Sequence, residues 1–395
     1  MFLLENLNRR PRRKKDMKDR FLLFACAALL LMAPTLYADS YNEIMDSDGP
    51  GGRNITAFDR ASKLVMGGYF DTEWVSDTAT NTFKAHRLIL AASSKLHKNL
   101  FFNAEIEYEY GGLINAGSDD GELKIEQAWL DYRISDAVVL RGGVVVVPFG
   151  LVNVLHDSDV RDTTNRPIYG TSIVPTTWMD SGAGLHGKVD VGEDLIVRYE
   201  GYIINGLTSA ISGTSGVRSA RPSLKSDNNR NKALVGRVAV SPYLGLEVGG
   251  SVYTGQHDVA EDYNLSMIGL DVLAKEGPFE VMAEWAQTSV ESDGTLPAKM
   301  NGYYVEGRYH FFPAFLKNTG LFDDFRNPQI TAFLRFGGVD LDTSVTDIND
   351  RTQTTVGFNY RPIQTVAFKL EYELNGEEVS NVVTNKVAGS VAVGF

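Results

Sequence analysis

The sequence predicts an all-β fold, a 16-stranded antiparallel transmembrane β-barrel with short periplasmic turns and an inward-folding third outer loop. Three observations predict it. From Leu64 onward, segments of roughly ten residues alternate between apolar and polar side chains. Short and long connections alternate between these segments. The chain ends in a further alternating segment, with Val391, Val393 and Phe395 on one face. The lipid core contains no water to form hydrogen bonds with unpaired backbone groups. Membrane-spanning strands must therefore all pair with one another in a closed barrel.

The alternation and the turn residues between segments define the expected strands, with boundaries uncertain by about two to four residues. We expect the strands at 64–76, 82–94, 99–110, 122–134, 137–147, 182–190, 194–204, 232–241, 244–254, 264–274, 279–290, 301–312, 328–339, 351–361, 365–375 and 386–395.

The third expected strand, 99–110, shows the alternation most clearly. Its apolar residues are expected to face lipid, and Glu105, Glu107 and Glu109 are expected to face the lumen. A soluble β-sandwich is the alternative for a single strand of this kind, but the repetition along the chain favours a barrel. Aromatic residues near segment ends, such as Tyr69 and Trp74, would form girdles at the membrane interfaces.

The first 38 residues predict a secretory signal peptide. A basic stretch precedes the apolar run from Phe21 to Leu36, and cleavage is expected after Ala38. Residues 39–63 are polar and glycine-rich, which indicates a periplasmic N-terminal lead-in before the barrel at 64–395. The expected location is therefore the bacterial outer membrane.

The translation start and the only cysteine both belong to the leader. Either Met1 or Met17 would provide a normal basic region before the apolar run, and Cys26 would be removed with the signal. The whole chain has a formal charge of −12. Without the leader, 30 basic and 47 acidic residues remain, a charge of −17. This acidity argues against nucleic acid as a partner.

The long connection 148–181 is the strongest functional candidate. Sixteen strands enclose a water-filled lumen, which something must narrow. This segment has apolar and proline anchors at both ends and carries Arg161 and Arg166. Folded inward, it would form the constriction. The alternative is an outer loop that contacts only neighbouring loops or subunits.

Several short motifs resemble the phosphate-selective porin O/P family of outer-membrane porins. The motifs are KIEQAWLDY at 124–132, LRGG at 140–143, VPFG at 147–150, IVPTTW at 173–178, FFPAFLKN at 311–318 and FLRF at 333–336. The resemblance implies trimeric pores whose third outer loop folds inward, with the passage of phosphate or other anions. Phe395 at the end of the last strand also resembles the assembly signal of outer-membrane barrels, which implies recognition by the barrel assembly machinery.

Ion selectivity in such a pore depends on charge rings and on pore width. Arg87, Arg133 and Arg141 share the parity of the lumen side, and we expect them to form an anion-admitting patch beside the inward loop. The acids of the third strand could equally make a weakly cation-selective general porin, and many of these charges could simply pair with each other. The basic stretch from Arg218 to Arg230 could gather anions or bind lipopolysaccharide phosphates.

Other functions are less well supported by the sequence. The six histidines show no spacing typical of a catalytic triad or a metal cluster, so we expect neither an enzyme nor a cofactor. An adhesin or structural barrel is not excluded. The expected partners are outer-membrane lipid and lipopolysaccharide, small ions and solutes, and two further copies of the chain in a homotrimer.

Overall fold

The computed structural model describes residues 64–111, 121–192, 194–316, 325, 327–345, 350–377 and 382–395. The predicted signal peptide, 1–38, and the periplasmic lead-in, 39–63, lie outside these residues. Among the described residues, no helix has the length and apolar character needed to cross a membrane.

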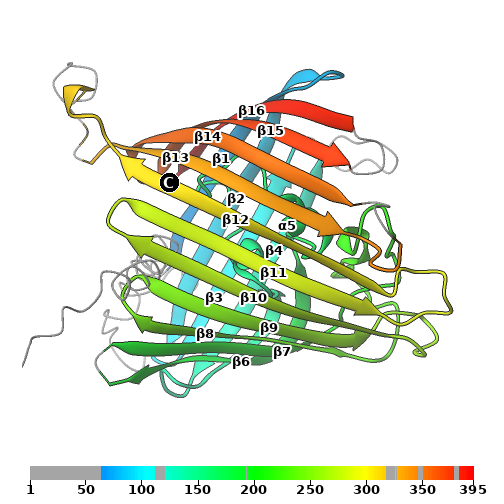
Figure 1. Cartoon of the computed structure of the whole chain (residues 1–395). Helices are drawn as coiled ribbons and strands as arrows, with labels where there is room; N and C mark the ends of the chain where they lie inside the picture. The colour runs from blue at the N-terminus through cyan, green and yellow to red at the C-terminus, as the bar shows by residue number, and fades with distance from the viewer. Residues whose placement is uncertain are drawn as a thin grey trace, which may run out of the picture.

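Sixteen antiparallel strands close into one barrel, each paired with its neighbours in sequence (Figure 1). This confirms the predicted fold, and the strand ends differ from the expected ones by up to four residues. The strands are β1 (Leu64–Ser76), β2 (Asn81–His97), β3 (Leu100–Glu109), β4 (Glu122–Arg133), β5 (Val139–Val146), β6 (Met179–Val191), β7 (Leu195–Ile204), β8 (Ala233–Tyr243), β9 (Leu246–Gln256), β10 (Asn264–Glu276), β11 (Phe279–Val290), β12 (Lys299–Phe311), β13 (Gln329–Asp340), β14 (Arg351–Ile363), β15 (Val366–Glu377) and β16 (Val382–Gly394).

The first and last strands form the seam that closes the barrel. β1 pairs with β16 from Tyr69 opposite Gly394 to Ser76 opposite Val387. Beyond this ladder, Phe395 accepts a hydrogen bond from the Gly68 amide at 3.1 Å and donates one to the Gly68 carbonyl at 2.9 Å. None of the sixteen described strands therefore has an unpaired edge, and a lipid environment requires such complete pairing.

The period-2 pattern separates an apolar outer face from a polar inner face. On β3, Ile106 is exposed on the outside, whereas Glu105 and Glu107 are buried inside the barrel. Tyr69 differs from its expected position in an aromatic girdle. It is only 4% exposed, because it lies on the same face of β1 as the buried acids Asp71 and Glu73. Its hydroxyl therefore points into the lumen.

The two ends of the barrel differ in the length of their connections. One end carries tight turns, such as Leu244–Gly245 between β8 and β9. The other end carries the long connections 147–178 and 205–232. The described connections contain four short helices, namely α4 (Leu151–Val154), α5 (Ile168–Ser172), η1 (Arg218–Ala220) and η2 (Ala314–Leu316).

An apolar core lies inside one side of the barrel. Residues of the 147–178 connection pack there against the inner faces of β7 to β13, with Phe149, Tyr169 and Trp178 fully buried. Figure 1 shows α5 within the outline of the barrel. The lumen is thus partly filled by the chain itself.

We expect deletion of Phe395 to lower the yield of assembled barrel in the outer membrane. The deletion removes two seam hydrogen bonds, which together contribute about 1–3 kcal/mol. The folded fraction is measured on SDS gels as the compact band that disappears on boiling. Phe395→Ala keeps both backbone bonds and is the control. A normal yield for the deletion would contradict the prediction, and equal loss in both variants would assign the effect to the aromatic ring.

Candidate functional site

The connection 147–178 begins and ends on one apolar anchor. The ring centroids of Phe149 and Trp178 lie 6.4 Å apart, and both side chains are fully buried. Phe149 packs so closely on Gly269 of β10 that a Cβ there would approach the ring to 3.0 Å. Gly150 then adopts a φ of 70°, a conformation that favours glycine. This turn directs the chain into the lumen.

Polar contacts attach the start of this connection to the inner face of the barrel at β9 and β11. The Gly150 amide donates to the Ser251 hydroxyl of β9 at 3.1 Å. The Val152 amide donates to the Glu284 carboxylate of β11 at 2.6 Å. The Tyr304 hydroxyl of β12 donates to the same carboxylate at 2.7 Å. Short helix α4 is thereby held against the inside of the barrel.

The middle of the connection binds the opposite wall. Glu371 of β15 accepts three hydrogen bonds, from the Thr164 amide at 2.8 Å and from the Asn165 amide and side chain at 2.8 and 2.6 Å. Arg335 of β13 donates to the Asn165 carbonyl at 3.1 Å. The Thr164 hydroxyl lies 3.1 Å from the Ser390 hydroxyl of β16.

The connection therefore crosses the lumen from β9 and β11 to β13, β15 and β16. This confirms the predicted inward fold. It excludes the alternative in which the segment contacts only other outer loops. We call residues 147–178 the constriction loop.

The acids of β3 are paired rather than free. Arg87 contacts Glu107 at 3.0 Å and Glu109 at 3.2 Å. Glu105 accepts a short hydrogen bond from Gln127 of β4. The row of acids expected along this strand is thus neutralised or hydrogen-bonded locally.

The structure does not bring Arg87, Arg133 and Arg141 together. Arg87 lies opposite Glu109 at one end of β3. The Arg133 amide donates to the Asn99 carbonyl, just beyond the other end. Since a strand rises about 3.3 Å per residue, these arginines are separated by about 30 Å along the wall.

Arg133 and Arg141 each have local partners near the short turn between β4 and β5. Arg141 donates two hydrogen bonds to Asp131, at 2.7 and 2.8 Å, and its guanidinium lies 3.8 Å from the ring centroid of Trp129. Arg133 lies 3.5 Å from Asp136 in the turn. The constriction loop begins at the opposite end of β5.

Arg161 and Arg166 brace the constriction loop from within. Arg161 donates to the His156 carbonyl at 3.0 Å and to the Thr164 carbonyl at 2.9 Å. Arg166 donates to the same His156 carbonyl at 3.2 Å. These contacts fold the loop back on itself.

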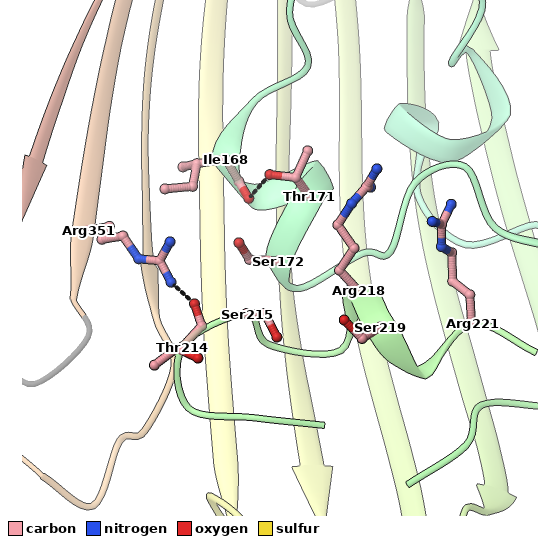
Figure 2. Close-up of a pocket in the computed structure, with 9 residues that line it drawn as sticks. All are labelled: Ile168, Thr171, Ser172, Thr214, Ser215, Arg218, Ser219, Arg221 and Arg351. Carbon is pink, nitrogen blue, oxygen red and sulfur yellow. Dashed lines mark hydrogen bonds between the residues drawn. The ribbon is translucent and has the colours of Figure 1, made fainter. Parts of the chain in front are cut away.

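A pocket of about 400 Å³ opens beside the constriction loop at the long-loop end of the barrel (Figure 2). Helix α5 contributes one side, η1 and the following residue contribute another, and the first residue of β14 completes it. We call it the arginine pocket. Its lining residues are Ile168, Thr171, Ser172, Thr214, Ser215, Arg218, Ser219, Arg221 and Arg351.

The three arginines of this pocket bind neutral acceptors. Arg218 donates to the Thr176 carbonyl and Arg221 to the Thr177 carbonyl, the latter at 2.9 Å. Arg351 donates to the Thr214 carbonyl. Within the described parts of the chain, no carboxylate forms an ion pair with Arg218 or Arg221. A guanidinium has five N–H donors, so several donors of each group remain for a ligand.

The arginine pocket carries positive charge at neutral pH. Burial and the neighbouring Arg221 lower the pKa of Arg218 to about 10, and burial also lowers the pKa of Arg221. The pKa of Arg218 thus lies well above pH 7, and arginine side chains stay protonated in proteins, so both guanidinium groups are cationic under ordinary conditions. Hydroxyl groups of Thr171, Ser172 and Ser219 add neutral hydrogen-bonding groups.

Three groups of histidine and carboxylate side chains lie close enough to hold a metal ion in the described region. They are Asp71 with Glu73 and His86, Glu126 with His156 and Asp157, and Asp162 with Glu280 and His310. The sequence spacing did not indicate them, because each joins different strands or a strand and the constriction loop.

Comparison with protein families decides what the barrel is. The family model of phosphate-selective porins O and P matches residues 68–268, half of the chain. The chain belongs to this family. It is an outer-membrane porin, a channel-forming barrel, as its motifs imply. A protein of Aquifex aeolicus, itself uncharacterized, is 27% identical over 338 residues, covering 78% of the porin and 75% of the relative.

Solved structures share the fold of the porin at low sequence identity. An anion-selective porin from Comamonas acidovorans matches with a TM-score of 0.55 and 13% identity, over 84% of this chain and 99% of that one. OmpF of Salmonella typhi gives 0.54 and 12%, over 84% and 97%. OmpT of Vibrio cholerae, in its trimer form, gives 0.53 and 11%, over 84% and 99%.

Sequence reasoning found part of this site. The basic stretch of the 205–232 loop was visible as a run of Arg and Lys residues. Its contacts with α5 and with Arg351 were not, because 130 residues separate Arg221 from Arg351 in the chain.

We expect the porin to conduct more when the constriction loop is shortened. Replacing 158–169 by a short Gly-Ser linker removes the contacts with the far wall but no strand hydrogen bond. Single-channel conductance in planar bilayers should rise, with the heat-modifiable band retained. A Gly-Ser replacement of 258–263, between β9 and β10, is the control. Equal conductance for the shortened and native loops would argue that this segment does not limit the pore.

Proposed function

We propose that this porin passes small hydrophilic solutes by passive diffusion and favours anions, with the arginine pocket as the collecting point. The observation that carries the proposal is the grouping of Arg218, Arg221 and Arg351 beside the constriction loop, bonded to carbonyl oxygens. Selectivity in a pore comes from the few charges at its narrow part. Phosphate is one anion whose geometry suits guanidinium donors.

Net charge does not oppose this proposal. Charges farther than about 8 Å from the path are screened at physiological ionic strength. The acids of β3 lie beside Arg87 and Gln127, which satisfy them. We retain Arg87 and the acids Glu105, Glu107 and Glu109 as pore-lining groups whose effect on selectivity is secondary to the pocket.

The proposal includes export, assembly and partners. Residues 1–38 would direct export and be removed, and 39–63 would lead into the barrel. We propose a homotrimer, as in the trimer form of the similarly folded OmpT. Outer-membrane lipid would cover the apolar outer face, and lipopolysaccharide and the barrel assembly machinery would be further partners. The proposal contains no catalytic step.

We expect Arg218→Gln combined with Arg221→Gln to reduce the anion preference of the porin. The double change removes two positive charges from the pocket, which weakens its attraction for anions. Reversal potentials in a KCl gradient measure the preference, at low salt where screening is weakest.

Lys225→Gln combined with Arg230→Gln is the matched control. It removes the same charge from exposed positions of the same loop, outside the pocket. Anion preference should fall in the first pair and persist in the second. Cation preference in the native protein, unmoved by either pair, would favour a weakly cation-selective general porin instead.

A further inference from the structure

One of the three histidine–carboxylate groups has buried ligand atoms that lack hydrogen-bond partners among the described residues. Glu126 lies in β4 at a bulge, where the pairing with β3 shifts between Gln127 and Ile125. A bulged residue is left out of the ladder, and its side chain is redirected. The Glu126 side chain is fully buried, and both of its carboxylate oxygens lack a hydrogen bond in the described structure.

The constriction loop places two more ligands beside this carboxylate. His156 Nδ1 lies 2.7 Å from the Asn153 carbonyl, which only accepts hydrogen bonds, so Nδ1 carries the proton. In the neutral ring, Nε2 then has a free lone pair. It lies 3.5 Å from Glu126 Oε1 and 3.5 Å from Asp157 Oδ1, beyond ordinary hydrogen-bond length. Within the part of the chain that the structure describes, Nε2 is buried and has no hydrogen-bond partner.

The spacing of these atoms fits a metal ion. Ligands at about 2.0–2.1 Å from tetrahedral Zn²⁺ are separated from one another by about 3.4 Å. The observed separations of 3.5 Å match this ligand-to-ligand distance. The three ligand atoms all lie within 4.8 Å of one another.

We propose that Glu126, His156 and Asp157 bind a divalent transition-metal ion of the zinc class, which fastens the constriction loop to β4. Two carboxylates and a neutral imidazole carry a charge of −2, which one divalent ion neutralises. This removes the cost of an unpaired carboxylate in a buried position. The side chain of Asp157 is 27% exposed, so the ion has access from the lumen and a position for water.

Outer contacts support the ligands in the orientation that binding needs. The Asn153 carbonyl fixes the histidine tautomer, and the Tyr69 hydroxyl donates to Asp157 at 3.1 Å. Contacts of this kind orient metal ligands and raise affinity.

In the other two groups, the histidines already have close polar partners. In the first, His86 Nδ1 lies 3.0 Å from both Asp71 and Glu73. In the third, His310 is 2.9 Å from the Thr331 hydroxyl and 3.2 Å from Glu280, which also pairs with Arg308. His310 thus has a partner at each ring nitrogen, so it serves as the internal control.

Cobalt titration of the purified, EDTA-treated porin tests the proposal. Four-coordinate Co²⁺ absorbs strongly in the visible range, and we expect a saturable signal that ZnCl₂ removes. His156→Asn retains a donor toward the Asn153 carbonyl but lacks Nε2, and Glu126→Gln keeps the shape without the charge. Each should weaken binding by at least about tenfold, as even outer-shell changes do. His310→Asn should leave it unchanged.

Two outcomes would overturn the proposal. One is the absence of saturable Co²⁺ absorption in the native protein. The other is equal binding in the native protein and in whichever of the two ligand variants retains the heat-modifiable band. Reversal potentials measured in EDTA do not depend on the bound metal ion. Absence of metal binding would therefore not contradict the proposed anion preference, and absence of anion preference would not contradict the metal site.

Discussion

Charged side chains inside the barrel need partners, and the backbone of the constriction loop provides them. Glu371 takes three N–H groups from the loop, while Lys369 and Arg335 donate to loop carbonyls. A buried charge without a partner is costly, and so is a buried backbone group. The side chains of the wall and the backbone of the loop therefore provide hydrogen-bond partners for each other, and removing either would leave the other without these contacts.

The hydrogen bonds between the constriction loop and the barrel wall also determine where the arginine pocket lies. The amide of Ile168, the first residue of α5, donates to Gln353 of β14 at 3.1 Å, which fixes the helix against the wall. The same short helix presents Thr171 and Ser172 to the pocket, opposite Arg218. The pocket is thus a consequence of how the loop is anchored, because its sides come from segments that meet only through the lumen.

Most of the barrel was predictable from local sequence. The alternation of apolar and polar residues along β3 and β16 shows which face of each strand contacts lipid. This pattern can be recognised from residues two positions apart in the sequence. Contacts across the lumen depend on closure and register. Nothing in the sequence indicates that Glu126 sits at a bulge. Tyr69 was misplaced because its aromatic character suggested an interface, whereas strand parity places it inside.

The partners of the constriction loop lie far along the chain, which has a consequence for the order of assembly. Thr164 meets Ser390 across 226 residues, and Asn165 meets Glu371 across 206. The loop cannot gain these bonds until the last two strands have joined the sheet, and those strands also complete the seam with β1. Closing the wall and completing the far anchorage of the constriction loop therefore coincide, and an intermediate that still lacks β15 and β16 has neither the seam nor these contacts.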